Sequence, residues 1–238
     1  MKEIHIAYLY YDFLNLYGEN GNIKILKKQL ENQGLTVYVH FLTLNDELHF
    51  KDYDLLYIGA GTEDNQKIAL NHLLTYQNDI KEYIEDNKFV LATGNALELF
   101  GKCIKTSIKD YEALHIFDYY TKEEEFRMID ECIFTCDFLE EPLIGFQNQY
   151  TVTRDIKNYL FDVKRGIGSY PKSGKEGFHY KNFYGTYLIG PIMIRNPHFL
   201  EYFIKELVLN KYSDFEFKEF DLEIEKKAYQ DYNNYFNK

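Results

Sequence analysis

The turn Thr93–Ala96 lies in the sequence context of a catalytic elbow. The residues before it, Phe89–Ala92, form a short apolar run typical of a buried strand, and a helix is expected to begin near Leu97. In such an elbow the apex residue is strained and lifts its side chain toward the helix N-terminus, where a Ser or Cys acts as the nucleophile. The apex here is Gly94, which has no side chain. The sequence therefore predicts the backbone of a nucleophilic site without its nucleophile.

Nearby residues offer poor replacements for a nucleophile. Thr93 precedes the apex and is expected to point to the opposite side of the strand, into the core. Cys103 lies more than two helical turns beyond the turn. His115 and His179 have no nucleophile to serve, so we interpret them as packing or surface residues.

Strands and helices alternate along the first half of the chain. Strands are expected at Glu3–Tyr11, Leu35–Leu42, Asp54–Ile58 and Phe89–Ala92, and helices at Asn22–Gln33 and Thr62–Asn87, the latter with a break near Asn78. This succession predicts an α/β fold with a doubly wound, mostly parallel sheet and helices on both faces. Ligands of such sheets bind beyond the carboxyl ends of the strands, which is where the Gly94 turn falls.

The second half of the chain shows a different pattern, which predicts shorter strands. They are expected at Arg127–Phe138, Leu143–Gln147, Thr151–Arg154, Leu160–Lys164 and Tyr184–Leu188, followed by a helix at Pro197–Leu209. Asn210–Phe220 is interpreted as a linker and Leu222–Phe236 as a polar terminal helix. We therefore predict one domain over residues 1–210, with a linker and a C-terminal helix over residues 211–238.

Composition excludes several classes of function. The formal net charge is -11 with no basic run, so nucleic acid is not an expected partner. No apolar run is long enough to span a bilayer. The three cysteines, Cys103, Cys132 and Cys136, together with the absence of a signal peptide, indicate a cytoplasmic protein. Cys132 and Cys136 lack further soft ligands nearby, so no metal site is expected. No cofactor is expected either.

Five segments in order resemble the class I glutamine amidotransferases of the cobyric-acid-synthase-like (CobB/CobQ) group, which implies a flavodoxin-like fold. The segments are Leu14–Ile23, Tyr57–Gln66, the turn around Gly94, Gly145–Asn148 and Lys181–Pro191. Within this group they look most like the glutaminase subunits of the cell-wall enzymes that amidate lipid II. The resemblance implies that a backbone N–H of the glycine turn helps to form an oxyanion hole. It places a ligand and oxyanion pocket at Gly59, Gly61, Gly94, Asn95, Glu98 and Asn148.

The departures from the family pattern are at the positions that carry out catalysis in the family. Gly94 stands where the resemblance implies the nucleophilic Cys, and Ile189 stands where it implies the general-base His. Ala96 and Glu98 replace a Gly and a Gln of the same turn, and Gln149 replaces a His. A thiolate needs a neighbouring His, and groups of this kind act as a unit. The sequence therefore predicts that no catalytic residue is intact.

Three functional hypotheses remain open. The chain is a degenerate subunit that partners or regulates a Mur-ligase-like synthetase in cell-wall precursor modification. Alternatively, it is an active glutaminase that supplies ammonia for lipid II or cobyric-acid-type amidation through an unrecognised nucleophile. The third hypothesis is a stand-alone sensor that binds glutamine or another small carboxylate. A glutamine hydrolysis assay separates the second hypothesis from the others, and capture of a ligase-like partner separates the first from the third.

Overall fold

Six strands form the first sheet of the computed structural model, which describes residues 2–236, and five of them are parallel. The order of its strands is β11-β12-β4-β3-β1-β2, with only β11 antiparallel to its neighbour. The strands are β1 (Glu3–Leu9), β2 (Thr36–Leu42), β3 (Leu55–Ile58), β4 (Phe89–Thr93), β11 (Phe178–Tyr180) and β12 (Phe183–Thr186). The predicted doubly wound, mostly parallel sheet is thereby confirmed, and the chain beyond β4 returns to add β12 beside it.

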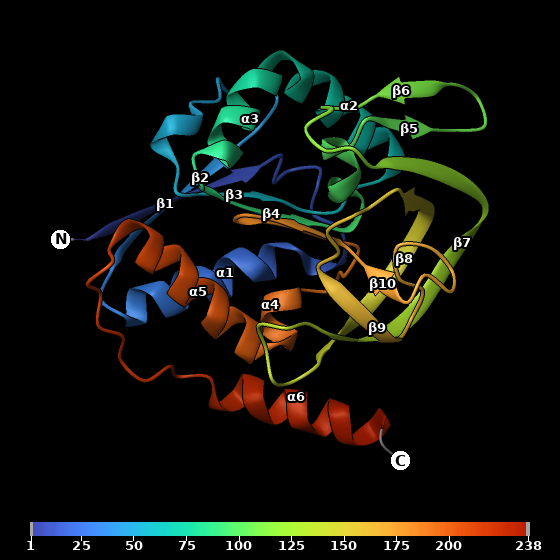
Figure 1. The fold of residues 1–238 in the computed structure, drawn as a ribbon. Helices are drawn as coiled ribbons and strands as arrows, with labels where there is room; N and C mark the ends of the chain where they lie inside the picture. The colour runs from blue at the N-terminus through green and yellow to red at the C-terminus, as the bar shows by residue number, and fades with distance from the viewer. Residues whose placement is uncertain (1, 237–238) are drawn as a thin grey trace.

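Helices cover both faces of this sheet (Figure 1). One face carries α1 (Asn20–Asn32), α4 (Ile192–Arg195) and α5 (Pro197–Lys211), and the other carries α2 (Glu63–Leu73) and α3 (Gln77–Glu85). The predicted stretch Thr62–Asn87 is thus two helices, separated by the 3-10 turn Leu74–Tyr76 close to the expected break. The Thr62 side chain caps α2 by accepting a hydrogen bond from the Asn65 N–H.

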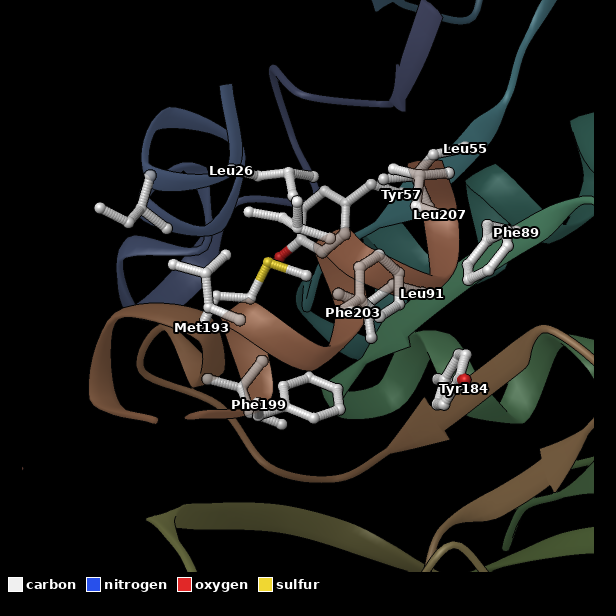
Figure 2. Close-up of a cluster of buried hydrophobic side chains, with 14 of the residues drawn as sticks. Leu26, Leu55, Tyr57, Phe89, Leu91, Tyr184, Met193, Phe199, Phe203 and Leu207 are labelled. Carbon is white, nitrogen blue, oxygen red and sulfur yellow. The ribbon is translucent and has the colours of Figure 1, made fainter. Parts of the chain in front are cut away.

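Two cores lie on opposite faces of the sheet, because side chains alternate along each buried strand. On β1, Ile4 and Ile6 point into the core beneath α1 and α5, whereas Ala7 points into the core beneath α2 and α3. Phe203 of α5 is fully buried in the first core and packs edge-on against Phe89 of β4 (Figure 2). Strands buried on both faces read as continuous apolar runs, which explains why β3 and β4 were recognisable in the sequence.

The second sheet is built mainly from antiparallel pairs. Its order is β10-β9-β7-β5-β6, with β8 paired to β7 on the opposite side. The strands are β5 (Cys103–Lys105), β6 (Asp110–Glu112), β7 (Tyr120–Thr135), β8 (Leu143–Arg154), β9 (Phe161–Arg165) and β10 (Lys175–Glu176). The expectation of shorter strands is wrong for β7 and β8, which have 16 and 12 residues. Both strands carry polar residues on a half-exposed face, and in the sequence alone such residues look like breaks between shorter strands.

The segment after α5 is attached to the first sheet's helical layer. Leu222 is fully buried in the core, and Gln29 of α1 donates a hydrogen bond to the Asp221 carbonyl. The final helix, α6 (Glu223–Phe236), lies beside α4 and α5, and its Tyr229 hydroxyl donates to the Pro142 carbonyl at 2.7 Å. A separate unit over residues 211–238 stays a prediction.

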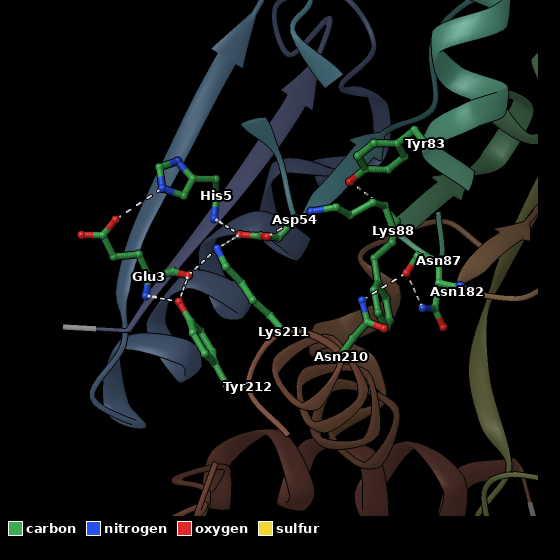
Figure 3. A network of polar contacts seen from close by, with 11 residues as sticks. Glu3, His5, Asp54, Tyr83, Asn87, Lys88, Asn182, Asn210, Lys211 and Tyr212 are labelled. Atoms are coloured by element: carbon green, nitrogen blue, oxygen red, sulfur yellow. Dashed lines mark hydrogen bonds and ion pairs between the residues drawn. The ribbon is translucent and has the colours of Figure 1, made fainter. Parts of the chain in front are cut away.

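A polar network joins the amino ends of the parallel strands to the end of α5 (Figure 3). The Asp54 carboxylate accepts from the His5 N–H at 2.9 Å and from Lys211 Nζ at 2.7 Å. Tyr212 donates its hydroxyl to the Glu3 carbonyl at 2.9 Å. These contacts fix α5 at the sheet edge opposite the Gly94 turn.

The Phe203→Ala substitution tests how far the fold depends on the first core. Because Phe203 is fully buried among aromatic rings, its truncation is expected to lower the free energy of unfolding by about 3–5 kcal/mol. Phe126→Ala is the matched control, since that side chain is 76% exposed and its loss should change stability by less than about 0.5 kcal/mol. Urea denaturation measures both. Equal effects of the two substitutions would contradict the assignment of this core.

Candidate functional site

The Gly94 turn follows β4 directly at the carboxyl edge of the first sheet. Gly94 has a φ of 60°, in the left-handed region that favours glycine. The helix that the sequence predicts near Leu97 is a 3-10 helix, and it begins earlier, since it spans residues Gly94–Phe100. The Leu99 and Phe100 carbonyls accept hydrogen bonds from the loop at residues 114–117, which takes the place of a further helical turn.

Gly94 and Ile189 lie side by side, as the sequence predicted for these two positions. A Cβ atom added at Gly94 would lie 3.0 Å from the Ile189 Cγ2 and only 2.6 Å from the Ala60 Cβ. Ile189 is buried, and its N–H donates to the Phe146 carbonyl of β8 at 3.0 Å. The space that a nucleophilic side chain would occupy is therefore filled by two apolar neighbours.

A pocket of about 160 Å³ opens next to this turn. It brings together seven of the residues singled out in the sequence, namely Gly61, Gly94, Asn95, Glu98, Asn148, Gln149 and Ile189. Gly59 lies outside the lining, because it is buried against the first loop. A Cβ there would be 2.6 Å from the Leu14 carbonyl oxygen. Gly59 thus permits close packing of the loop and does not face a ligand.

The backbone donor expected to form an oxyanion hole is already occupied. The Gly61 N–H donates to Asn95 Oδ1 at 3.0 Å, and Asn95 Nδ2 donates back to the Gly61 carbonyl at 3.0 Å. This reciprocal pair satisfies both backbone groups of Gly61, the N–H and the C=O. An anion can reach that N–H only after the Asn95 side chain moves away.

Glu98 is a buried carboxyl in the wall of the pocket. It accepts hydrogen bonds from Gln66 Nε2 at 2.8 Å, from the Tyr187 hydroxyl at 3.2 Å and from the Thr151 hydroxyl. Burial raises the pKa of Glu98 to about 7, although these three donors oppose the shift. The side chain can therefore hold or release a proton near neutral pH.

Two further buried carboxyls adjoin the same sheet edge, and their burial is not indicated by the sequence. Glu19 accepts from the Tyr57 hydroxyl at 2.5 Å and from the Thr93 hydroxyl, which confirms that Thr93 points away from the pocket. Glu176 accepts from the Tyr187 N–H at 2.7 Å. Burial raises the pKa of each carboxyl to about 7. Both glutamates lie in glycine-rich loops in the sequence, where a carboxylate ordinarily indicates a solvated position.

The mouth of the pocket is rimmed by a chain of polar contacts. Asn148 Nδ2 donates to the Tyr17 hydroxyl at 2.9 Å, and Asn148 Oδ1 accepts from Arg127 at 3.2 Å. Arg127 also forms an ion pair with Glu63 at the start of α2. Sequence reasoning identified only Asn148 of these four residues. The others come from three separate elements, because Tyr17 lies in the turn after β1, Glu63 in α2 and Arg127 in β7.

No Cys, His or Ser side chain is found among the residues lining the pocket. Cys103 is in β5, and Cys132 is buried in β7, where burial raises the pKa of its thiol. Over residues 2–236, no three His, Cys, Asp or Glu side chains are grouped as a metal site would require. No helix in the same range is long and apolar enough to cross a membrane.

Comparison with known proteins identifies the family of the chain. The CobB/CobQ-like glutamine amidotransferase domain matches residues 5–197. The GatD subunit of the glutamine-hydrolyzing lipid II isoglutaminyl synthase of Staphylococcus aureus (strain N315) is 32% identical over 231 residues, 97% of this chain and 95% of that protein. The GatD subunit from Streptococcus pneumoniae (strain ATCC BAA-255 / R6) is 30% identical over 233 residues, 96% of this chain and 86% of that protein.

The chain belongs to the CobB/CobQ-like glutamine amidotransferase family. The crystal structure of a glutamine amidotransferase from Thermotoga maritima superposes with a TM-score of 0.53 at 11% identity, covering 98% of this chain and 94% of that one. At this identity the likeness concerns the fold alone.

The buried carboxyls predict a pH-dependent stability. Because the pKa of Glu98 is about 7 in the folded state against 4.5 for the free side chain, its contribution to stability is complete below pH 4.5 and is lost as pH rises through 7. Glu98→Gln should therefore remove on the order of 3 kcal/mol from the fall in unfolding free energy between pH 4 and pH 8.

Urea denaturation over this pH range measures the effect. Glu216→Gln is the matched control, because Glu216 is exposed and its replacement should leave the pH profile unchanged. A Glu98→Gln profile that is parallel to that of the unsubstituted chain would show that Glu98 titrates normally.

Proposed function

We propose that this chain is a non-hydrolysing, amidotransferase-like subunit of an assembly that amidates a cell-wall precursor of the lipid II type. Its partner in this proposal is a Mur-ligase-like synthetase subunit, and the complex works in the cytoplasm. The identity of about 30% with two lipid II isoglutaminyl synthase subunits, over nearly the whole chain, supports the assembly. Gly94 and Ile189, which stand where the resemblance implies the nucleophile and the base, support the non-hydrolysing role.

The packing around Gly94 is the observation that carries the proposal. A nucleophile needs a side chain at the apex and a base beside it. Here Ala60 and Ile189 fill that volume at 2.6 and 3.0 Å from a hypothetical Cβ. The reciprocal pair between Asn95 and Gly61 also removes a donor that would stabilise an oxyanion. The site thus has no side chain at the nucleophile position, an apolar side chain at the base position and an oxyanion donor that is already bonded.

This arrangement also bears on ligand binding in the pocket. Glutamine or another small carboxylate would have to displace the Asn95 amide before it could use the Gly61 N–H. The Glu98 carboxylate adds a negative charge to the wall when it is ionised. Both features favour a role in assembly over one in binding glutamine.

One contact favours a second candidate, a glutaminase that uses an unrecognised nucleophile. The Thr151 hydroxyl donates to Glu98, whose pKa of about 7 suits a general base. Thr151 lines the same pocket. If glutamine hydrolysis is found, Thr151→Val should abolish it, and a glutamine-mimicking electrophile should label Thr151. Activity that survives this substitution would show that Thr151 is not the nucleophile.

The main prediction is that the purified chain, alone or with its partner, releases no glutamate from glutamine above background. Removal of one member of a catalytic set typically costs about 10⁴- to 10⁶-fold in rate, and here two positions lack a reactive group. Coupled detection of glutamate measures this. A glutamine-hydrolysing member of the family, assayed in parallel, is the positive control. Turnover of glutamine at a comparable rate would refute the proposal.

Restoring the catalytic pair tests the assignment of Gly94 and Ile189. Because a Cβ at Gly94 would collide with Ala60, the test variant combines Ala60→Gly, Gly94→Cys and Ile189→His. Its thiol should be alkylated at least about tenfold faster near pH 7 than that of the Ala60→Gly, Gly94→Cys variant, since only the former has an imidazole to hold the thiolate. Equal alkylation rates in two folded variants would mean that these positions do not correspond to a catalytic pair.

A further inference from the structure

β2 forms a free edge of the first sheet. It pairs with β1 along all seven of its residues, Thr36–Leu42, and within residues 2–236 it has no ladder partner on its other side. We call these seven residues the β2 edge. The opposite margin of the sheet is β11, beside β12. The second sheet joins the first on that side, through a bridge between Phe146 and Ile189, so the β2 edge lies away from it.

The β2 edge lacks the features that usually protect an edge strand, which are charged residues, proline and bulges. The run Asn32–Asn45 contains no Asp, Glu, Lys, Arg or Pro, although 27% of the chain is charged. The ladder between β2 and β1 has no bulge. Burial lowers the pKa of His40, so this side chain is neutral near pH 7. The edge is therefore open to a further strand.

The backbone of β2 presents three residues to its open side. Thr36 donates its N–H to the Lys2 carbonyl at 3.0 Å, so the backbone groups of Thr36 face β1. Successive residues of a strand direct their N–H and C=O groups to alternate sides. The backbone groups of Val37, Val39 and Phe41 therefore face away from β1, where the described part of the chain offers them no ladder partner.

This pattern is complementary to itself under a two-fold rotation. Antiparallel pairing of two copies about Val39 sets Val39 opposite its counterpart and Val37 opposite Phe41, so each outward-facing residue meets another. Hydrogen-bonded pairs of this kind exchange both of their N–H···O bonds. On the other face of the sheet, the same register sets Tyr38 opposite His40. Aromatic and β-branched side chains that lie opposite one another stabilise antiparallel strands.

Large apolar side chains are exposed along the β2 edge. Tyr38 is 45% exposed and Phe41 is 56% exposed. Phe41 packs edge-on against Tyr11, with ring centroids 5.2 Å apart. In the two-fold pair, Phe41 lies against Val37 of the second copy and loses part of its exposed surface. Removal of apolar surface from water supplies a driving force for the association.

Charges near the edge come from other elements, and they are the same in both copies. α1 carries Lys24, Lys27 and Lys28 on one side of the sheet, and Asp52 lies close to His40 on the other. A two-fold pair brings like charges to the same side, and each copy has a net charge of -11, so electrostatics opposes the pairing. Salt screens this repulsion. A dimer formed through the β2 edge should therefore tighten as salt rises, whereas a complex held by opposite charges would weaken.

We propose that two copies of this chain associate through their β2 edges, antiparallel about Val39, so that their two six-stranded sheets become one continuous sheet. A second copy fits this edge because the outward backbone groups match themselves in register, while the uncharged strand offers nothing to select a charged partner. No residue of β2 lines the pocket beside Gly94. The inference therefore goes beyond the proposed function and does not depend on it.

Sedimentation of the full-length chain tests the proposal. At protein concentrations on the order of 100 µM the chain should sediment with twice its mass of 28.5 kDa. The dissociation constant should fall as salt is raised from about 50 to about 500 mM. A chain that stays monomeric at every concentration would overturn the proposal, and so would a dimer that weakens with salt.

Substitution of Phe41 shows whether the β2 edge is the contact. Phe41→Lys places a charge opposite Val37 of the other copy and should raise the dissociation constant at least about tenfold. Ile108→Lys is the matched control, because Ile108 is 91% exposed and lies between β5 and β6. Its dissociation constant should stay within about twofold of the unsubstituted value. Equal dissociation constants for the two variants would exclude this edge.

A cysteine at the two-fold position reports the register without weakening the dimer. Two copies paired about Val39 bring its Cα atoms to about 5.5 Å, which suits a disulfide. Val39→Cys should therefore form a covalent dimer under mild oxidation, seen on a non-reducing gel. The Ile108→Cys variant and the unsubstituted chain, treated alike, should remain monomeric on that gel. A Val39→Cys sample that is dimeric in solution and does not cross-link would contradict the pairing.

Discussion

The close contact of Gly94 with Ala60 and Ile189 is the constraint on which the candidate site depends. It joins three strand-end segments at the carboxyl edge of the parallel sheet, where the fold places ligand sites. A left-handed backbone at Gly94 allows this approach, since glycine carries no Cβ. The same contact that stabilises the edge also fills the volume that chemistry would need. Apolar packing and a nucleophilic side chain therefore cannot share this volume, and here Ala60 and Ile189 occupy it.

The polar groups of this edge are organised around carboxyls instead of a nucleophile. Glu19, Glu98 and Glu176 are buried and are held by hydroxyl and amide donors, without a basic side chain among the contacts described. Burying a carboxylate as an anion costs free energy, so the raised pKa values of these groups follow from desolvation. Glu98 and Glu176 are joined through Tyr187, which donates its hydroxyl to Glu98 and its N–H to Glu176 of the second sheet. Glu98 is the carboxyl of the three that lines the pocket.

The sequence predicted the parallel sheet, its covering helices and the adjacency of Gly94 and Ile189, because these depend on continuous apolar runs and on ordered motifs. It did not predict the length of β7, whose acidic run at Glu123–Glu125 looks like a loop until its pairing is known. It also did not predict the burial of Glu19 or the contact of Asn95 with Gly61. These depend on which loops meet at the sheet edge, and local spacing does not report such long-range contacts.

The hydrogen bonds between Asn95 and Gly61 make the Asn95 amide a tethered internal ligand. A group held by its own backbone competes at an effective concentration of millimolar or more, so a weakly binding external anion is excluded by competition alone. The apparent affinity of such an anion is its intrinsic affinity multiplied by the fraction of time that the amide is displaced. The Asn95 side chain therefore closes the Gly61 N–H to an external anion, and its displacement requires no rearrangement of the fold around it.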